Sequence, residues 1–153
     1  RRQITSMLQQ KNIPYHQRTQ KKQAPTGTLV YLADTTGELS KLIECADLAF
    51  GGKTLSPNRG GQNPIEPIAL GIPLVLGPNF QNFQQTCGDL LIHEAIQTTE
   101  SQESAQKELL SLAQNSQDRK ELKQNAFSWF QSQGSPSDRT LEKLFQLLQS
   151  SPT

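Results

Sequence analysis

The sequence has few of the features that usually identify a function. Aromatic residues are scarce (six Phe, two Tyr and one Trp) and the formal net charge is only +1. Nothing therefore steers nucleic acid to this protein, and we expect no nucleic-acid partner. No apolar run approaches the roughly 18 residues that a membrane-spanning helix needs. The two cysteines, Cys45 and Cys87, form no CxxC motif, and we expect both to be small buried hydrophobic residues without a disulfide.

Residues for metal or triad chemistry are also scarce. His16 and His93 have no partners at the spacing that metal ligands require. No Ser/His/Asp or Cys/His set can be assembled either. We therefore expect neither a metal site nor a cofactor.

Short apolar runs alternate with segments of helical periodicity. Helices are predicted at 2–12, 35–46, 64–70, 83–93, 101–113 and 117–132, and strands at 28–33, 48–50, 74–76 and 96–98. A further helix is predicted from Ser135, and the segment from His16 to Gly27 is predicted to be a loop. Thr35 and Glu38 have the spacing of a capping box. This alternation predicts an α/β fold, a Rossmann-like parallel sheet flanked by helices.

The chain begins with Arg1-Arg2-Gln3 inside a predicted helix and without a methionine. We expect residues 1–153 to form one domain of a longer protein. In a parallel sheet, ligands bind beyond the carboxyl ends of the strands. The loops at 34–38, 51–63 and 77–80 all follow predicted strands, so we expect them on one rim.

The segment from Gly51 to Pro67 contains the most informative pattern. Gly60 and Gly61 lead directly into a helix that Asn63 can cap, with Pro64 at its first position. Glycines allow close approach of the backbone, and unpaired N–H groups beside a helix start favour an anion such as a nucleotide. The alternative is that the glycines only make a turn.

A nucleoside triphosphatase loop is excluded by spacing. Gly52-Lys53-Thr54 resembles the end of that motif, but the motif needs another glycine five residues before Gly52. Asp47 occupies that position.

Two charged residues of the same segment each have two interpretations. Glu66 either caps the N–H of Asn63 or accepts hydrogen bonds from the two hydroxyls of a ribose. Lys53 either neutralises a phosphate or sugar carboxylate or is simply solvated. Asn79 and Asn82 follow a strand, where a turn explains them as well as a ligand does.

Four segments occur in an order that resembles a known family: DTTGEL (34–39), FGGKTL (50–55), GGQNPIEP (60–67) and GPNFQNF (77–83). Together they resemble the C-terminal half of the 3-deoxy-D-manno-octulosonic acid (Kdo) transferases. The resemblance implies one half of a GT-B glycosyltransferase fold, which holds the CMP-Kdo donor. Two positions depart from the family: Gln62 stands where His is frequent, and Gly52-Lys53-Thr54 stands where Gly-Gly-Ser is frequent.

The resemblance also implies which residues line the donor site. They are Gly37, Glu38, Leu39, Asn63, Pro64, Ile65 and Glu66, joined by Lys53, Gly60 and Gly61 from the glycine-rich loop. Glu66 is assigned to the ribose. The family's catalytic carboxylate belongs to an N-terminal domain, so we expect no catalytic residue in this chain. We also expect the first strand of the half-domain to lie before Arg1.

The same resemblance implies the wider setting. The complete enzyme would transfer Kdo to a lipid A precursor through the missing domain, in peripheral contact with the cytoplasmic face of the inner membrane. The alternatives are a GT-B domain for a UDP-sugar and a nucleotide-binding module without catalytic activity.

Overall fold

The computed structural model describes residues 2–20 and 23–134. The chain divides into two compact units, Arg1–Leu42 and Ile43–Thr153, and each is described separately. The helix predicted from Ser135 lies outside the described residues.

The first unit contains a pair of parallel strands. Its elements are α1 (Arg2–Gln10), β1 (Tyr15–Gln17), the 3₁₀ turn η1 (Arg18–Gln20), β2 (Val30–Leu32) and most of α2 (Leu39–Ile43). Strand β1 pairs with β2, and His16 lies opposite Tyr31. The predicted loop from His16 to Gly27 is therefore wrong at its start. Strand β1 has only three residues, which are too few to show a clear alternation of polar and apolar side chains. The strand is held by its pairing with β2.

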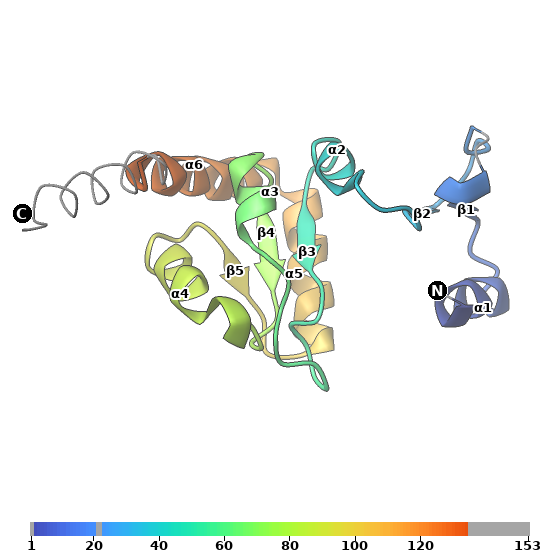
Figure 1. Cartoon of the computed structure of the whole chain (residues 1–153), viewed down its shortest axis with the longest axis horizontal. Coiled ribbons are helices and arrows are strands. Elements are labelled where there is room, and N and C mark those ends of the chain that lie inside the picture. Colours follow the sequence, from blue (N-terminus) through green and yellow to red (C-terminus); the bar gives the residue numbers. More distant parts are fainter. Residues whose placement is uncertain (1, 21–22, 135–153) are drawn as a thin grey trace, which may run out of the picture. The chain divides into compact units, whose positions relative to one another are not determined.

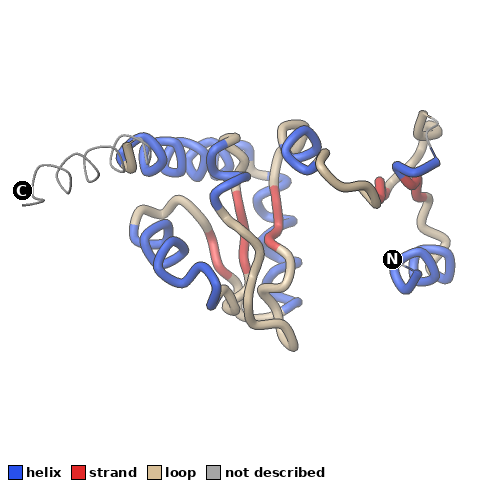
Figure 2. Tube along the Cα trace, in the orientation of Figure 1, coloured by secondary structure: helices blue, strands red, loops and turns tan. Residues whose placement is uncertain are grey.

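The second unit contains a three-stranded parallel sheet in the order β3-β4-β5, drawn side by side in Figure 1. Its strands are β3 (Ala49–Gly51), β4 (Leu74–Leu76) and β5 (Gln97–Thr98). Its helices are α3 (Ile65–Ala69), α4 (Gln84–Ile92), α5 (Gln102–Gln114) and α6 (Ser116–Ser132), with the 3₁₀ turn η2 (Gln81–Phe83) before α4. Figure 2 shows helices on both sides of these strands. The predicted parallel α/β fold is confirmed.

Strand β4 lies at the centre of the core. All three of its residues are buried, because side chains on both of its faces meet helices. Leu74 and Leu76 belong to a cluster with Ile68 of α3, Leu90 of α4 and Trp129 of α6. Val75 points the other way, into a second cluster with Leu112 of α5 and Leu122 of α6. The alternation of strand side chains thus places helices on both faces.

The two cysteines have different environments. Cys87 is buried in the larger cluster, as predicted, but Cys45 is exposed. Helix α2 ends at Ile43, so the helical repeat that would turn Cys45 inward does not reach it. In the described ranges, no helix combines the length and the apolar character that crossing a bilayer requires.

Alanine substitutions at two glycines of the second unit are expected to have opposite effects on stability. A methyl group on Gly77 would collide with the carbonyl oxygen of Thr54 and lie 2.7 Å from Leu55 Cδ2. We expect Gly77→Ala to destabilise the second unit by about 2 kcal/mol. The matched control is Gly88→Ala in α4, where nothing lies within 4 Å of the added atom. It should be neutral or stabilise by about 0.5–1 kcal/mol.

Urea unfolding followed by tryptophan fluorescence measures both changes. The only tryptophan of the chain, Trp129, is buried in the second unit. Equal changes in the free energy of unfolding for the two substitutions would contradict the close packing described at Gly77.

Candidate functional site

The loops that follow β3 and β4 meet at the carboxyl end of the sheet. The N–H of Asn79 donates to the carbonyl of Thr54 over 2.9 Å, and the N–H of Asn82 donates to the carbonyl of Gly60 over 3.2 Å. Two of the three loops predicted on one rim are therefore joined. The third, at 34–38, belongs to the first unit.

Thr54 is the residue that fastens these loops, and sequence reasoning missed it. Its side chain is fully buried, donates to the Gly51 carbonyl over 2.6 Å and accepts from the Gly77 N–H over 2.7 Å. One hydroxyl thus satisfies backbone groups at the ends of both β3 and β4. A Thr side chain three residues after the end of a strand can donate a hydrogen bond to the last backbone carbonyl of that strand. The position of Thr54 was therefore the sequence signal that could have revealed its role.

The glycine pair lies where the loop after β3 turns back on itself. Gly61 has a φ of +72°, and its N–H donates to the Lys53 carbonyl over 3.1 Å. That amide is therefore not unpaired, as the sequence interpretation assumed. A side chain on Gly60 would lie 2.7 Å from Asn82 Nδ2. The two glycines let the loop fold back on itself and approach the next loop closely.

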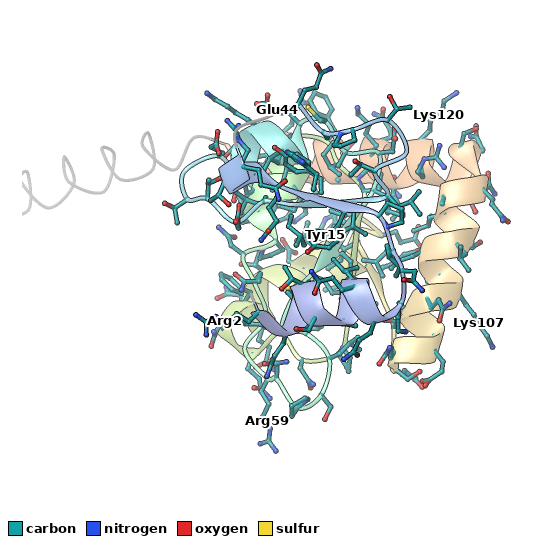
Figure 3. The ribbon with its side chains drawn as sticks, turned by 90° about the vertical axis from the view of Figure 1, so that its right-hand side faces the viewer. Arg2, Tyr15, Glu44, Arg59, Lys107 and Lys120 are labelled. Carbon is teal, nitrogen blue, oxygen red and sulfur yellow. The ribbon has the colours of Figure 1, made fainter. Side chains whose placement is uncertain are left out.

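Lys53 lies beside this turn with its side chain exposed. Its φ of 59° is unusual for a residue with a side chain. A conformation of this kind persists only where its surroundings impose it, and such residues cluster at ligand sites. The structure therefore brings Lys53, Gly60 and Gly61 together. At the tip of the same loop, Arg59 points away from the fold (Figure 3).

The start of α3 is close to the predicted one. Asn63 Oδ1 accepts from the Ile65 N–H over 3.0 Å, but the residue at the N-cap position is Pro64, which provides no capping side chain. The helix begins at Ile65, one residue later than predicted, and Pro64 is fully buried. Glu66 is half-buried in the first turn. Because α3 has only five residues, its dipole is small, and an anion here would depend on the loop and on Lys53.

The predicted residues Gly37, Glu38 and Leu39 lie in the first unit, where α2 starts at Leu39. The predicted capping box of Thr35 and Glu38 is wrong, because the helix starts several residues after Thr35. Gly37 has a φ of +81°, which is not helical, so the helix begins only after Glu38. Thr35 and Glu38 do meet, but through their side chains, since the Thr35 hydroxyl donates to Glu38 Oε2 over 2.5 Å.

Arg18 is a second residue that sequence reasoning missed. It donates twice to the Glu38 carboxylate, from Nε over 3.2 Å and from Nη2 over 2.9 Å. These bonds, followed by the one from Thr35, lower the pKa of Glu38 to about 2 from the usual 4.5. The stabilisation from a carboxylate with a lowered pKa is present above its unfolded value and is lost as the pH falls towards 2.

The described residues contain no group of three His, Cys, Asp or Glu side chains that could hold a metal ion. The second unit instead carries an exposed cation, Lys53, in the loop after β3 and a carboxylate, Glu66, in the first turn of α3. Such a set suits an anionic ligand that carries hydroxyl groups.

Comparisons with known proteins find relatives of this chain in one family. A 3-deoxy-D-manno-octulosonic acid transferase of Haemophilus influenzae is 27% identical over 123 residues, which is 80% of this chain and 29% of the relative. The enzyme of the same name from Bordetella pertussis is 30% identical over 115 residues, 75% of this chain and 27% of the relative. The chain thus spans less than a third of the length of these relatives. No protein-family model matches it.

A solved structure is also similar. The C-terminal CMP-Kdo binding domain of WaaA from Acinetobacter baumannii matches with a TM-score of 0.80 and 26% identity. The match covers 84% of this chain and 67% of that domain. These similarities confirm the resemblance predicted from the four motifs, and with it the fold of one GT-B half.

Proposed function

We propose that this chain, a homologue of the Kdo transferases in the region of their C-terminal domain, is the donor-binding part of such an enzyme and holds CMP-Kdo. The observation that carries the proposal is the fold it shares with a domain that binds CMP-Kdo. The rim of the second unit supplies groups of the right chemistry. Lys53 provides a positive charge, and Glu66 provides an acceptor in the first turn of α3.

In the complete enzyme, a carboxylate of the N-terminal domain would take the proton of the acceptor hydroxyl. The acceptor oxygen would then bond to the anomeric carbon of Kdo while the bond from that carbon to the phosphate of CMP breaks. Negative charge builds on the departing phosphate, and a fixed cation and fixed amides around it would lower the barrier. No step of this scheme needs a metal.

The acceptor in this proposal is a lipid A precursor. The enzyme would then work at the cytoplasmic face of the inner membrane, in peripheral contact through the complete protein. This setting follows from the family alone.

Calorimetric titration of the protein with CMP, UMP and UDP tests the donor. CMP and UMP carry the same phosphate and ribose, so any difference between them reports on the base. We expect saturable binding of CMP that is at least about tenfold tighter than that of UMP, because a site built to hydrogen-bond one base leaves groups unpaired with another. Preference for UDP would indicate a UDP-sugar donor, and no binding of any of the three would contradict the proposal.

A further inference from the structure

Lys53 has an unusual backbone conformation that no helix end explains. Its φ of 59° lies in the left-handed region, which residues with a side chain rarely adopt. In the described ranges, two other residues with side chains share it, Asn12 with a φ of 52° and Glu94 with a φ of 51°. Each of those lies two residues beyond a helix, where a left-handed residue is a common cap. Lys53 follows strand β3 instead, so its conformation needs another reason.

Hydrogen bonds on both sides of Lys53 impose this conformation. The carbonyl of Lys53 accepts from the Gly61 N–H over 3.1 Å, which closes the loop between these two residues. The next residue, Thr54, is fully buried, and its hydroxyl bonds to Gly51 and Gly77. The side chain of Lys53 itself is exposed. The loop thus fixes where this side chain leaves the backbone, two residues beyond the carboxyl end of β3, and ligands of parallel sheets bind beyond such strand ends.

The conformation of Lys53 lowers the stability of the fold. Glycine adopts a positive φ readily, whereas a residue with a Cβ atom is strained there. Among the described residues, no carboxylate forms an ion pair with Lys53 that would offset this loss. Residues kept in such conformations cluster at ligand sites, where the side chain has a function that glycine cannot supply. The function that remains for Lys53 is to present its charge to a ligand.

We propose that Lys53 recognises the phosphate of the nucleotide, and that the protein retains it although its backbone conformation lowers folding stability. This inference rests on the proposed function, because it assigns the nucleotide to the loops after β3 and β4. All the residues that it uses belong to the second unit. The phosphate carries the charge of CMP at neutral pH, so Lys53 determines the preference for CMP over the uncharged nucleoside cytidine.

The substitution Lys53→Gly separates stability from binding, because glycine suits the backbone conformation and removes the cation. Urea unfolding followed by Trp129 fluorescence should show a midpoint raised by roughly 0.5 M. Calorimetric titration of the same variant should show CMP binding weakened about tenfold, since a hydrogen bond to a charged group is lost. Its affinity for cytidine should stay within about twofold of the unchanged protein, since cytidine has no phosphate.

The matched control is Glu94→Gly, which replaces another charged, left-handed residue of the second unit by glycine. Glu94 lies between α4 and β5, so it precedes its strand and is not at the carboxyl end. Glu94→Gly should raise the urea midpoint in the same way and change CMP binding by no more than about twofold. A second variant, Lys53→Arg, keeps both the cation and the strained backbone. It should retain most of the affinity for CMP and show no gain in stability.

The outcomes distinguish this inference from the proposed function. If the unchanged protein binds neither CMP nor cytidine, the proposed function fails and this inference fails with it. If the unchanged protein binds CMP and Lys53→Gly binds it equally well, the proposed function stands and Lys53 is an ordinary solvated residue. Equal losses of CMP and cytidine binding in Lys53→Gly would indicate a disturbed loop and contradict recognition of the phosphate. A lowered urea midpoint for Lys53→Gly would contradict the stability cost of the left-handed lysine.

Discussion

Replacement of Glu66 by alanine in the complete enzyme is expected to lower kcat/KM for CMP-Kdo about 100-fold. The proposed role of Glu66 is to accept hydrogen bonds from both ribose hydroxyls of the donor. A hydrogen bond to a charged group contributes about 1.5–3 kcal/mol, and about 3 kcal/mol in total corresponds to a factor of about 100. Steady-state kinetics with varied CMP-Kdo measures the change.

The control for Glu66→Ala is Glu121→Ala, which removes an exposed glutamate from α6 of the same unit. It should leave the kinetics unchanged. Glu66 is half-buried in the first turn of α3, and urea unfolding of Glu66→Ala separates a loss of donor binding from a loss of stability. Normal kinetics for Glu66→Ala would remove this residue from the donor site and leave its role as a structural one.

Replacement of Thr54 by valine is expected to have the largest effect on stability, about 2–5 kcal/mol. Valine has nearly the shape of threonine but no hydroxyl. The substitution therefore leaves the Gly51 carbonyl and the Gly77 N–H without the partner that each has now. The Gly77 N–H is buried and the Gly51 carbonyl is partly buried, so water replaces the lost bonds poorly. Urea unfolding followed by Trp129 fluorescence measures the loss.

Two variants serve as controls for Thr54→Val. Thr54→Ser keeps the hydroxyl and should retain most of the stability. Thr98→Val makes the same chemical change at an exposed position in β5 and should alter the free energy of unfolding by no more than about 0.5 kcal/mol. A cost for Thr54→Val below about 1 kcal/mol would show that its hydroxyl does not hold the two loops together.

The parts of the fold that could be predicted are those specified by local sequence. Strand β4 lies at its predicted residues because an apolar run is bounded by Pro73 and by Gly77-Pro78. Helices α5 and α6 begin where Ser101 and Asn115 cap them with side-chain hydrogen bonds. In each case the residues that decide the boundary are neighbours in the sequence.

The parts that could not be predicted depend on pairs far apart in the sequence. Arg18 reaches Glu38 across 20 residues, and Thr54 reaches Gly77 across 23. Only the pairing of the strands brings these partners together, and a short sequence motif does not reveal which strands pair. The amide of Gly61 is a similar case, because its partner is the carbonyl of Lys53 on the other side of a loop.

The candidate site also contains features that could be predicted from local sequence and features that could not. The side-chain hydrogen bond of Asn63 at the start of α3 could be predicted, since its partner is two residues away, but the helix starts one residue late and Pro64 takes the N-cap position. The register of α2 was wrong because the motif did not reveal that Gly37 adopts a positive φ. The resemblance supplied the proposed residues of the donor site, and the structure adds the side chains that hold the surrounding loops in place.

A crystal structure of the protein with bound CMP tests the central claim most directly. We expect the phosphate of CMP to lie against the loop that contains Lys53, and the ribose hydroxyls to lie about 3 Å from the Glu66 carboxylate. Clear density for CMP elsewhere on the protein, or saturating CMP that leaves this rim empty, would contradict the account.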